Sequence, residues 1–329
     1  MTGPPHPGRI MKRPCYRWLA PAIGLLFTAA YVWSLATPEV GQPARLPPPA
    51  AGKLWSFGFV GDTQLGEGIV DRIFERFEAS GVEFVLHLGD IVDDAASDKQ
   101  WQEVLGAARQ HHIRLRPVVG NHDRLVGTSD RGETRFREFF PELPDTFYRF
   151  SQGGLTFLML NSERSLMPWT EQGRFLGAEL NELAGTAVVC LHRPVFTCGR
   201  RDLANQFLRR LWLHARLVDS PTRLVLSGHH HYYDRTKPLD GITYVVSGGG
   251  SHKLYPPADT DRTTAAFHAG VNHYGLVDVY ADRLDVHVVD LDGAQLDRFT
   301  VERRLSERAT SETAGRVNRS LAQKGKVQR

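Results

Sequence analysis

The sequence predicts an α/β protein in which the first strands run parallel, and two observations carry this prediction. Short apolar runs of strand length, at 54–60, 84–88 and 115–119, alternate with the segments 69–79 and 101–109, whose apolar residues recur at helical spacing. The resulting β-α-β-α-β order needs crossover helices, which join parallel strands. With 329 residues and 41% hydrophobic content, the chain is long enough for one large domain or two ordinary ones.

The same alternation continues in the second half and then gives way to strands. A β-hairpin is predicted around Gly153-Gly154, between apolar runs at 147–150 and 155–160. Helix, strand, helix and strand follow at about 171–183, 186–191, 202–217 and 223–227. The remaining strands are predicted at 242–247, 275–280 and 284–290. This strand-rich end gives the predicted α/β class an α+β character, and no internal repeat is visible.

The N-terminus carries a candidate membrane span. Residues 16–36 read YRWLAPAIGLLFTAAYVWSLA, and the run from Trp18 to Ala36 is close to the roughly 20 apolar residues that cross a bilayer as a helix. Basic residues precede it within 1–15. The positive-inside rule therefore predicts a single-pass protein of the cell membrane, with the N-terminus in the cytoplasm and the rest of the chain on the extracytoplasmic side.

Two other interpretations of this segment were weighed. Ser34-Leu35-Ala36 resembles a small-residue cleavage site, which would make the segment a signal peptide and the protein secreted or periplasmic. A buried core helix is disfavoured by the basic flank and the proline-rich sequel, which predicts a stiff tether. The predicted parts are a cytoplasmic N-terminus (1–15), a transmembrane signal-anchor (16–36), a linker (37–52), a folded domain (53–299) and a basic, poorly ordered tail (300–329).

Charge and cysteine usage narrow the function classes. The formal net charge is +3, and the basic residues are concentrated at both ends, which leaves the central domain mildly acidic. No nucleic-acid partner is expected for such a domain. Three cysteines do not form a disulfide framework. Cys190 fits a small buried hydrophobe, and a bridge to Cys198 in an oxidising compartment is left open. The oligomeric state is not predicted.

Candidate ligands follow five of the predicted strands. They occur in Gly61-Asp62-Thr63-Gln64, Gly89-Asp90, Gly120-Asn121-His122-Asp123, His192 and Gly228-His229-His230-His231. Ligands of α/β sheets gather beyond the carboxyl ends of the strands, so these groups are expected to converge at one rim. Glycine precedes most of them because the backbone has to turn sharply and pass close to bound ions.

Any one of these residues alone means little, since an aspartate after a strand is more often a helix cap or a turn former. In the order GD-x-Q, GD, GNHD, H and GH-x-H, however, the motifs resemble those of the calcineurin-like metallophosphoesterase superfamily over most of residues 54–290. The resemblance implies a four-layer αββα sandwich around a two-metal centre, and an activity on phosphoric esters.

The resemblance also assigns metal ligands, for two divalent ions (Mn, Fe or Zn) whose identity stays open. The ligands implied for the first metal are Asp62, Gln64, Asp90 and His231. Those implied for the second, which shares the bridging Asp90 carboxylate, are Asp90, Asn121, His192 and His229. Because side chains alternate along an extended chain, His229 and His231 are expected to point into the site and His230 away from it.

One position departs from the commonest pattern of the superfamily, which has Asp-x-His where this chain has Asp62-Thr63-Gln64. An amide oxygen is a neutral and weaker ligand than an imidazole nitrogen, so the first metal is expected to be held less tightly. The change is not interpreted as a loss of activity.

The implied reaction is hydrolysis of a phosphomonoester or phosphodiester by in-line attack of a dimetal-bound hydroxide, while the ions neutralise the phosphate oxygens. His122 is the candidate to protonate the leaving oxygen or to brace the phosphate, and Asp123 or another carboxylate would fix its tautomer. Arg124 and Arg193 flank the motifs and are further candidates for phosphate contact.

Two competing functions were considered. A metallophosphoesterase-like scaffold that keeps the fold without turnover, tethered to the membrane, is disfavoured by the near-complete ligand set. A nuclease is disfavoured by the acidic centre of the chain. Several other histidines are predicted to be structural, namely His87, His214, His268 and His287.

Overall fold

The structure of the protein is a computed structural model. It describes residues 51–304 except 65, 67, 126, 128–131, 198–208 and 256–264, all within the compact unit that begins at Ala44. The predicted span at 16–36, the basic tail from 305 onward and Cys198 lie outside the described residues. Among the helices that are described, none has both the length and the apolar character needed to cross a bilayer.

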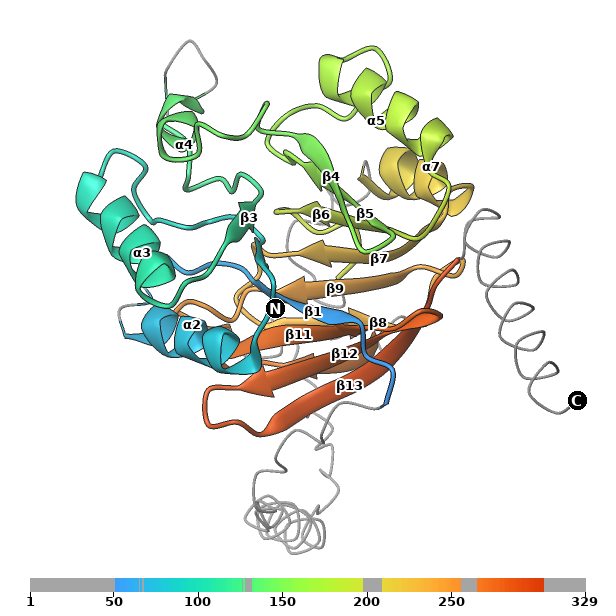
Figure 1. Ribbon diagram of the computed structural model, residues 1–329. Coiled ribbons are helices and arrows are strands. Elements are labelled where there is room, and N and C mark those ends of the chain that lie inside the picture. Colours follow the sequence, from blue (N-terminus) through green and yellow to red (C-terminus); the bar gives the residue numbers. More distant parts are fainter. Residues whose placement is uncertain are drawn as a thin grey trace, which may run out of the picture. The chain divides into compact units, whose positions relative to one another are not determined.

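Two sheets form the centre of the domain (Figure 1). The first has the order β13-β12-β11-β1-β2-β3. Its strands are β1 (Trp55–Val60), β2 (Val85–His87), β3 (Leu115–Pro117), β11 (His273–Val279), β12 (Arg283–Asp290) and β13 (Gln295–Glu302). Strands β1, β2 and β3 pair in parallel, and β11 joins β1 antiparallel, so the predicted β-α-β-α-β start is confirmed.

The second sheet has the order β10-β8-β9-β7-β6-β5-β4. Its strands are β4 (Tyr148–Gln152), β5 (Leu155–Leu160), β6 (Ala187–Leu191), β7 (Thr222–Ser227), β8 (Tyr233–Thr236), β9 (Thr243–Ser247) and β10 (Ala265–Ala269). Strands β5, β6, β7 and β9 are parallel in the middle of the sheet. Strands β4 and β5 form the predicted hairpin.

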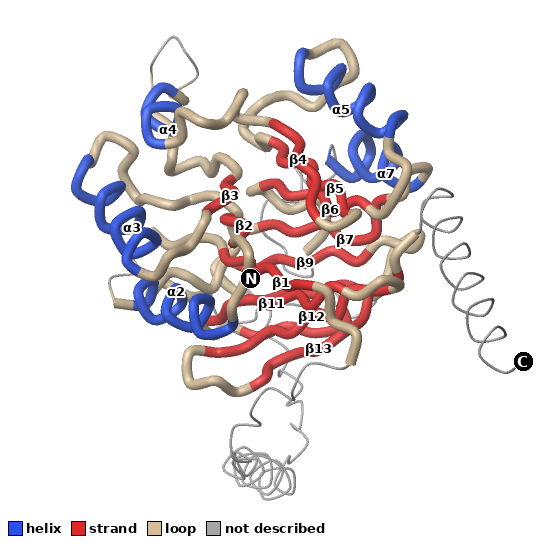
Figure 2. Tube along the Cα trace, viewed as in Figure 1, coloured by secondary structure: helices blue, strands red, loops and turns tan. Residues whose placement is uncertain are grey.

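Helices cover the outer faces of the two sheets, with α2 and α3 on one side of the strands and α5 and α7 on the other (Figure 2). The bounds are α2 (Ile69–Ser80), α3 (Asp98–Gln110), α4 (Thr134–Phe139), α5 (Glu171–Glu182), the π-helical turn η1 (Arg210–His214) and α7 (Ala215–Val218). Ser97 caps the N-terminus of helix α3. Its side chain accepts a hydrogen bond from the backbone N–H of Gln100.

Three apolar clusters define four layers. The cluster between the sheets includes Phe57 and Phe157, whose rings meet edge to face with centroids 5.3 Å apart. Phe77 and Trp101 belong to the cluster between the first sheet and its helices. Leu176 belongs to the cluster between the second sheet and α5, η1 and α7. The described domain is thus a mixed α/β sandwich of two sheets with helices outside, as the sequence predicted.

Some elements differ from the prediction. The predicted end of the domain at 299 falls inside β13, which continues to Glu302 opposite Arg283. That boundary is wrong because β13 exposes one polar face and its sequence, QLDRFTVE, resembles the tail in composition. The elements α4, β8, β10 and β13 were not predicted. Of the helix predicted at 202–217, the described part is π-helical over Arg210–His214 and α-helical over Ala215–Val218.

Candidate metal centre

The predicted ligands reach a common rim from both sheets. Strands β1, β2 and β3 of the first sheet and β6 and β7 of the second all end there, and backbone hydrogen bonds join the loops that follow them. The Asp62 amide donates to the Gly89 carbonyl at 2.9 Å, and the Gly228 amide donates to the His192 carbonyl at 3.0 Å. The rim is therefore a property of the sandwich and not of a single sheet.

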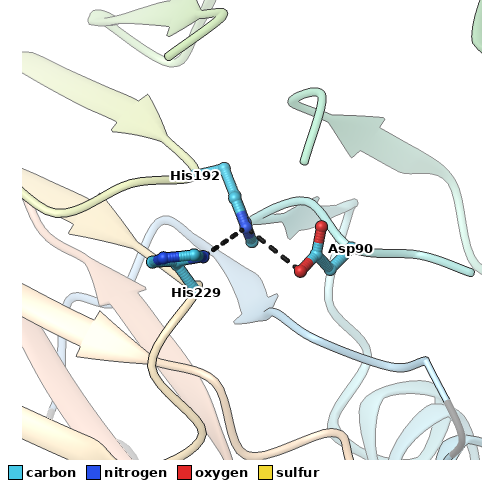
Figure 3. A group of neighbouring side chains, drawn as sticks. All are labelled: Asp90, His192 and His229. Atoms are coloured by element: carbon cyan, nitrogen blue, oxygen red, sulfur yellow. Dashed lines mark hydrogen bonds and ion pairs between the residues drawn. The ribbon is translucent and has the colours of Figure 1, made fainter. Parts of the chain in front are cut away.

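Four donors converge at one end of this rim. His192 Nε2 lies 3.2 Å from Asp90 Oδ2, 3.2 Å from Asn121 Oδ1 and 3.2 Å from His229 Nδ1. Figure 3 shows Asp90, His192 and His229 facing one another, and their ligand atoms all lie within 4.8 Å of one another. These are the four residues predicted for the second metal, and the structure brings all four together.

In His192 and His231, the hydrogen bond of Nδ1 decides which ring nitrogen faces the site. His192 Nδ1 lies 2.8 Å from the Leu88 carbonyl oxygen, and His231 Nδ1 lies 2.6 Å from that of Lys253. A carbonyl accepts from Nδ1–H, so Nε2 is the nitrogen that faces the site. In both rings Nε2 is therefore the atom that would bind a metal once its proton is displaced.

The residues predicted for the first metal form a second group. His231 Nε2 lies 3.4 Å from Asp62 Oδ1 and 3.5 Å from the Gln64 amide nitrogen, and the two amide atoms exchange places on rotation of the amide. Asp62 Oδ1 and Gln64 Oε1 are buried oxygens without a hydrogen-bond partner among the described residues. Buried oxygens without partners are costly, and a divalent cation satisfies them. The donor set therefore fits two cations, one in each group.

The backbone is strained at three of these ligands. Asp62, Asp90 and His229 have φ angles of 58°, 53° and 69°, in the left-handed region. Non-glycine residues held there cost about 1–3 kcal/mol each and are frequent at functional sites. The preceding glycines permit the close packing of these turns, since a Cβ at Gly228 would lie 2.5 Å from Asp62 Oδ2.

In the second group a proton occupies the place of a bound cation. Burial disfavours the Asp90 carboxylate, but the charge of His192 and hydrogen bonds outweigh burial and lower the pKa of Asp90. Burial opposes the charge on His192 too, yet Asp90 and Asp62 raise its pKa to about 10. Burial, with the charges of His192 and Arg193, lowers the pKa of His229 and keeps it neutral. A cation has to displace the proton of this buried pair, so metal binding should strengthen as pH rises.

His122 lies at the rim with its ring held by Asp93. Its Nδ1 is 2.9 Å from the Asp93 carbonyl oxygen and 3.4 Å from Asp93 Oδ1, and its backbone N–H donates to Asp90 Oδ1 at 2.9 Å. The carboxylate at this ring is therefore that of Asp93, which the sequence interpretation missed. Its signal is the spacing GD-x-x-D, three residues after Asp90.

Of the two predicted alternatives for the carboxylate at His122, Asp123 or another one, this geometry favours the second. The carboxylate of Asp123 is buried and accepts from the backbone amides of Ile91 (2.7 Å), Val92 (3.2 Å) and Gly120 (2.8 Å). Burial, together with the nearby Asp90 charge, raises its pKa to about 7. Asp123 thus joins the two loops that carry Asp90 and Asn121, and it is a positioning residue.

A buried carboxylate that the sequence interpretation missed holds two arginines at the same rim. Glu163, with only 8% of its side chain exposed, lies 2.5 Å from Arg193 Nε through Oε1 and 3.5 Å from Arg124 Nη1 through Oε2. Arg193 Nη1 in turn is 3.0 Å from His229 Nε2. Arg193 follows a metal ligand and Arg124 follows the GNHD motif, so both guanidinium groups border the metal centre. No sequence motif marks Glu163, because it belongs to the loop after β5.

Two further histidines lie where they were expected. His230 turns away from the ligands, with Nδ1 2.7 Å from the Tyr232 hydroxyl. His87 is buried under the site, with Nε2 2.9 Å from the Thr63 hydroxyl, and burial lowers its pKa to about 3. Both are structural neighbours of the ligands.

The motif order and this geometry agree with a known family. Residues 56–254 match the family of calcineurin-like phosphoesterases. This chain belongs to that family. The predicted superfamily is thereby confirmed.

Similar proteins include phosphatases. Phosphoenolpyruvate phosphatase of Allium cepa is 21% identical over 262 residues, which cover 73% of this chain and 53% of that protein. The uncharacterized protein Rv2577 of Mycobacterium tuberculosis is 29% identical over 151 residues, 38% of this chain and 28% of the relative. This chain thus spans about half or less of these relatives. Purple acid phosphatase PPD1 from yellow lupin shares the fold, with a TM-score of 0.67 and 18% identity over 80% of this chain and 56% of that chain.

Proposed function

We propose that this chain hydrolyses a phosphomonoester or a phosphodiester by in-line displacement at phosphorus, with two divalent cations as cofactors. The observation that carries the proposal is the convergence of two neighbouring donor groups that share one rim. One is built around His192 Nε2 and the other around the partnerless oxygens of Asp62 and Gln64. When bound, the two cations lower the pKa of a water molecule and neutralise charge on the phosphate oxygens.

The side chains around the ligands have separate tasks in this proposal. His122 is the residue that gives a proton to the leaving oxygen, since Asp93 holds Nδ1 and leaves Nε2 as the nitrogen that exchanges protons at the rim. The backbone N–H of His122 donates to Asp90 Oδ1, which fixes the position of the proposed acid relative to that of the proposed metal ligand. Asp123 keeps the two loops in register through three backbone amides.

Arg193 and Arg124 are proposed to bind the phosphate oxygens that face away from the cations. A guanidinium presents several N–H donors in a fixed plane, which suits phosphate. Glu163 holds Arg193 in place before substrate binds, so less rotamer entropy is lost on binding.

The first substrates to test are phosphomonoesters. Phosphoenolpyruvate, the substrate in the name of the Allium cepa relative, is a phosphomonoester. Release of p-nitrophenol from p-nitrophenyl phosphate in the presence of Mn²⁺ is the simplest assay. Asp90→Asn should lower the rate at least about 100-fold, whereas Asp292→Asn, at an aspartate whose side chain is 84% exposed, should not change it.

The competing scaffold function makes the opposite prediction. A scaffold would bind metal and keep its fold but would not turn over any ester in a panel of phosphomonoesters, phosphodiesters, cyclic nucleotides and lipid phosphates. If metal-loaded protein behaves in that way, the proposed hydrolysis is wrong.

The location is a second part of the proposal. The apolar run 16–36, with basic residues before it, supports an anchor that holds the domain on the extracytoplasmic side of the cell membrane. A cleaved signal peptide would instead give a soluble product that begins after residue 36. The mass of the N-terminal peptide and the partition between membrane and soluble fractions separate these alternatives, because only the anchor keeps residues 16–36 on a membrane-bound chain.

A further inference from the structure

An apolar cavity of about 180 Å³ lies beside the loop that carries Glu163. Its walls come from two segments, the loop after β5 and the start of η1. The apolar side chains that line it are Leu166, Met167, Trp212 and Leu213. Leu213 is 1% exposed and belongs to the core under the second sheet, whereas Trp212 is 36% exposed and borders solvent. Among the described residues, Leu213 thus forms the buried floor of the cavity and Trp212 its solvent-exposed edge.

Two hydrogen bonds join this cavity to the metal centre. Ser162, which lines the cavity, accepts from the Arg193 amide at 2.9 Å. Arg209, on the other wall, donates from Nε to the Pro194 carbonyl at 3.0 Å. The segment 193–194 directly follows the ligand His192, so the cavity lies next to the metal centre.

The lining has little charge that would favour a polar occupant. The guanidinium of Arg164 is paired with Glu133, a carboxylate that is 1% exposed, and lies 5.3 Å from the centre of the Phe147 ring. The Nε of Arg209 is held by the Pro194 carbonyl. What remains toward the cavity is mainly aliphatic and aromatic surface.

We propose that this cavity, the leaving-group pocket, binds the apolar part of the ester's leaving group and selects small alkyl or aryl phosphates. The inference rests on the proposed phosphoesterase activity. A dry apolar cavity of about 150 Å³ in another protein holds one benzene molecule, so about 180 Å³ accommodates one ring or a short alkyl chain. The phosphate would lie at Arg193 and the organic group would extend past Ser162 into the pocket.

A series of straight-chain alkyl phosphates tests the proposal, because the chemistry at phosphorus is the same throughout. Burial of one methylene contributes about 0.8 kcal/mol, which corresponds to a factor of about four in kcat/KM. We expect kcat/KM to rise about fourfold for each added carbon from methyl phosphate onward and to level off when the pocket is full. Inhibition by the matching alkylphosphonates, which are not hydrolysed, should show the same dependence on chain length.

Three variants connect this dependence to the pocket. Trp212→Ala removes a wall and should flatten the series, and Met167→Trp fills the pocket and should abolish the gain from longer chains. Trp169→Ala is the matched control, since Trp169 is 68% exposed and does not line the cavity. The thermal unfolding midpoint of each variant shows whether it is folded, and Met167→Trp carries the test if Trp212→Ala does not fold.

The outcomes separate the pocket from the activity. Turnover with a flat series in the wild type contradicts the pocket and leaves the phosphoesterase function intact. Without turnover, phosphonate binding that grows with chain length in the wild type and in Trp169→Ala, but not in Met167→Trp, still supports the pocket. Equal slopes in the wild type and the folded pocket variants, in either assay, would refute it.

Discussion

Replacement of Glu163 by aspartate tests whether this buried carboxylate positions the phosphate-binding arginines. The aspartate keeps the negative charge, so its long-range effect on a bound phosphate is preserved, but the shorter side chain withdraws from Arg193. In the wild type, Oε1 and Oε2 lie 2.5 Å from Nε and 3.3 Å from Nη2 of Arg193, which is one strong contact and one weak contact. Glu163→Asp therefore isolates the positioning effect.

The magnitude follows from the freedom that Arg193 regains. An arginine side chain carries about 2 kcal/mol of rotamer entropy, and Glu163 holds part of it in the folded protein. If all of it were lost again on phosphate binding, the affinity would fall about 30-fold, at about 1.4 kcal/mol for each factor of ten. We expect about a 10-fold fall, because the backbone on both sides of Arg193 still restrains it.

The assay is the inhibition constant for inorganic phosphate together with kcat/KM for p-nitrophenyl phosphate, both at saturating Mn²⁺. Metal content, measured by elemental analysis, should be unchanged, because Glu163 is not a ligand. Glu171→Asp is the matched control, since the Glu171 side chain is 67% exposed and lies 3.8 Å from Arg164. A Glu163→Asp enzyme within twofold of the wild type in both constants would refute the positioning role.

Three other predictions concern metal affinity, loop register and pH. Gln64→His should tighten one of two metal sites without affecting the other, because imidazole is the stronger ligand; metal titration that shows both sites unchanged would contradict this. Asp123→Asn should lower the free energy of unfolding by about 1–3 kcal/mol in urea titrations, because the amide NH₂ cannot accept from the backbone amides that the carboxylate satisfies. Burial lowers the pKa of His111, but hydrogen bonds to Asp71 and Glu78 outweigh burial and raise it above 6.5. Its contribution to stability is therefore full below pH 6.5 and is lost as pH rises through the folded-state pKa. In His111→Asn this loss between pH 6 and pH 9 should disappear, and urea midpoints that keep the wild-type slope would disprove the assignment.

The ligands were predictable because each is tied to a local signal. Asp62, Asp90 and His229 follow a glycine at a strand end, and all three have the left-handed backbone that such a turn produces. Strand ends of both sheets then converge because the sandwich packs the sheets face to face. Local sequence thus specified the chemistry, and the fold brought the donors together.

The supporting residues were not predictable in the same way. Glu163 meets Arg193 across 30 positions of sequence, and its loop carries no periodicity or motif. Asp123 was given the wrong role because adjacency to His122 suggested contact, whereas the turn directs its carboxylate to backbone amides on another loop. Strand β13 was not predicted, because its solvated face gives it the composition of a tail. In each case a tertiary contact decided the outcome.

The central claim is that two divalent cations occupy neighbouring sites at the rim of the sandwich, and metal stoichiometry in single-ligand variants tests it most directly. Wild-type protein equilibrated with Mn²⁺ is predicted to bind two ions per chain. His231→Ala should lose one and His192→Ala the other, whereas Asp90→Ala should weaken both. A single ion per chain, or one ion lost equally in His231→Ala and His192→Ala, would contradict the two-site account.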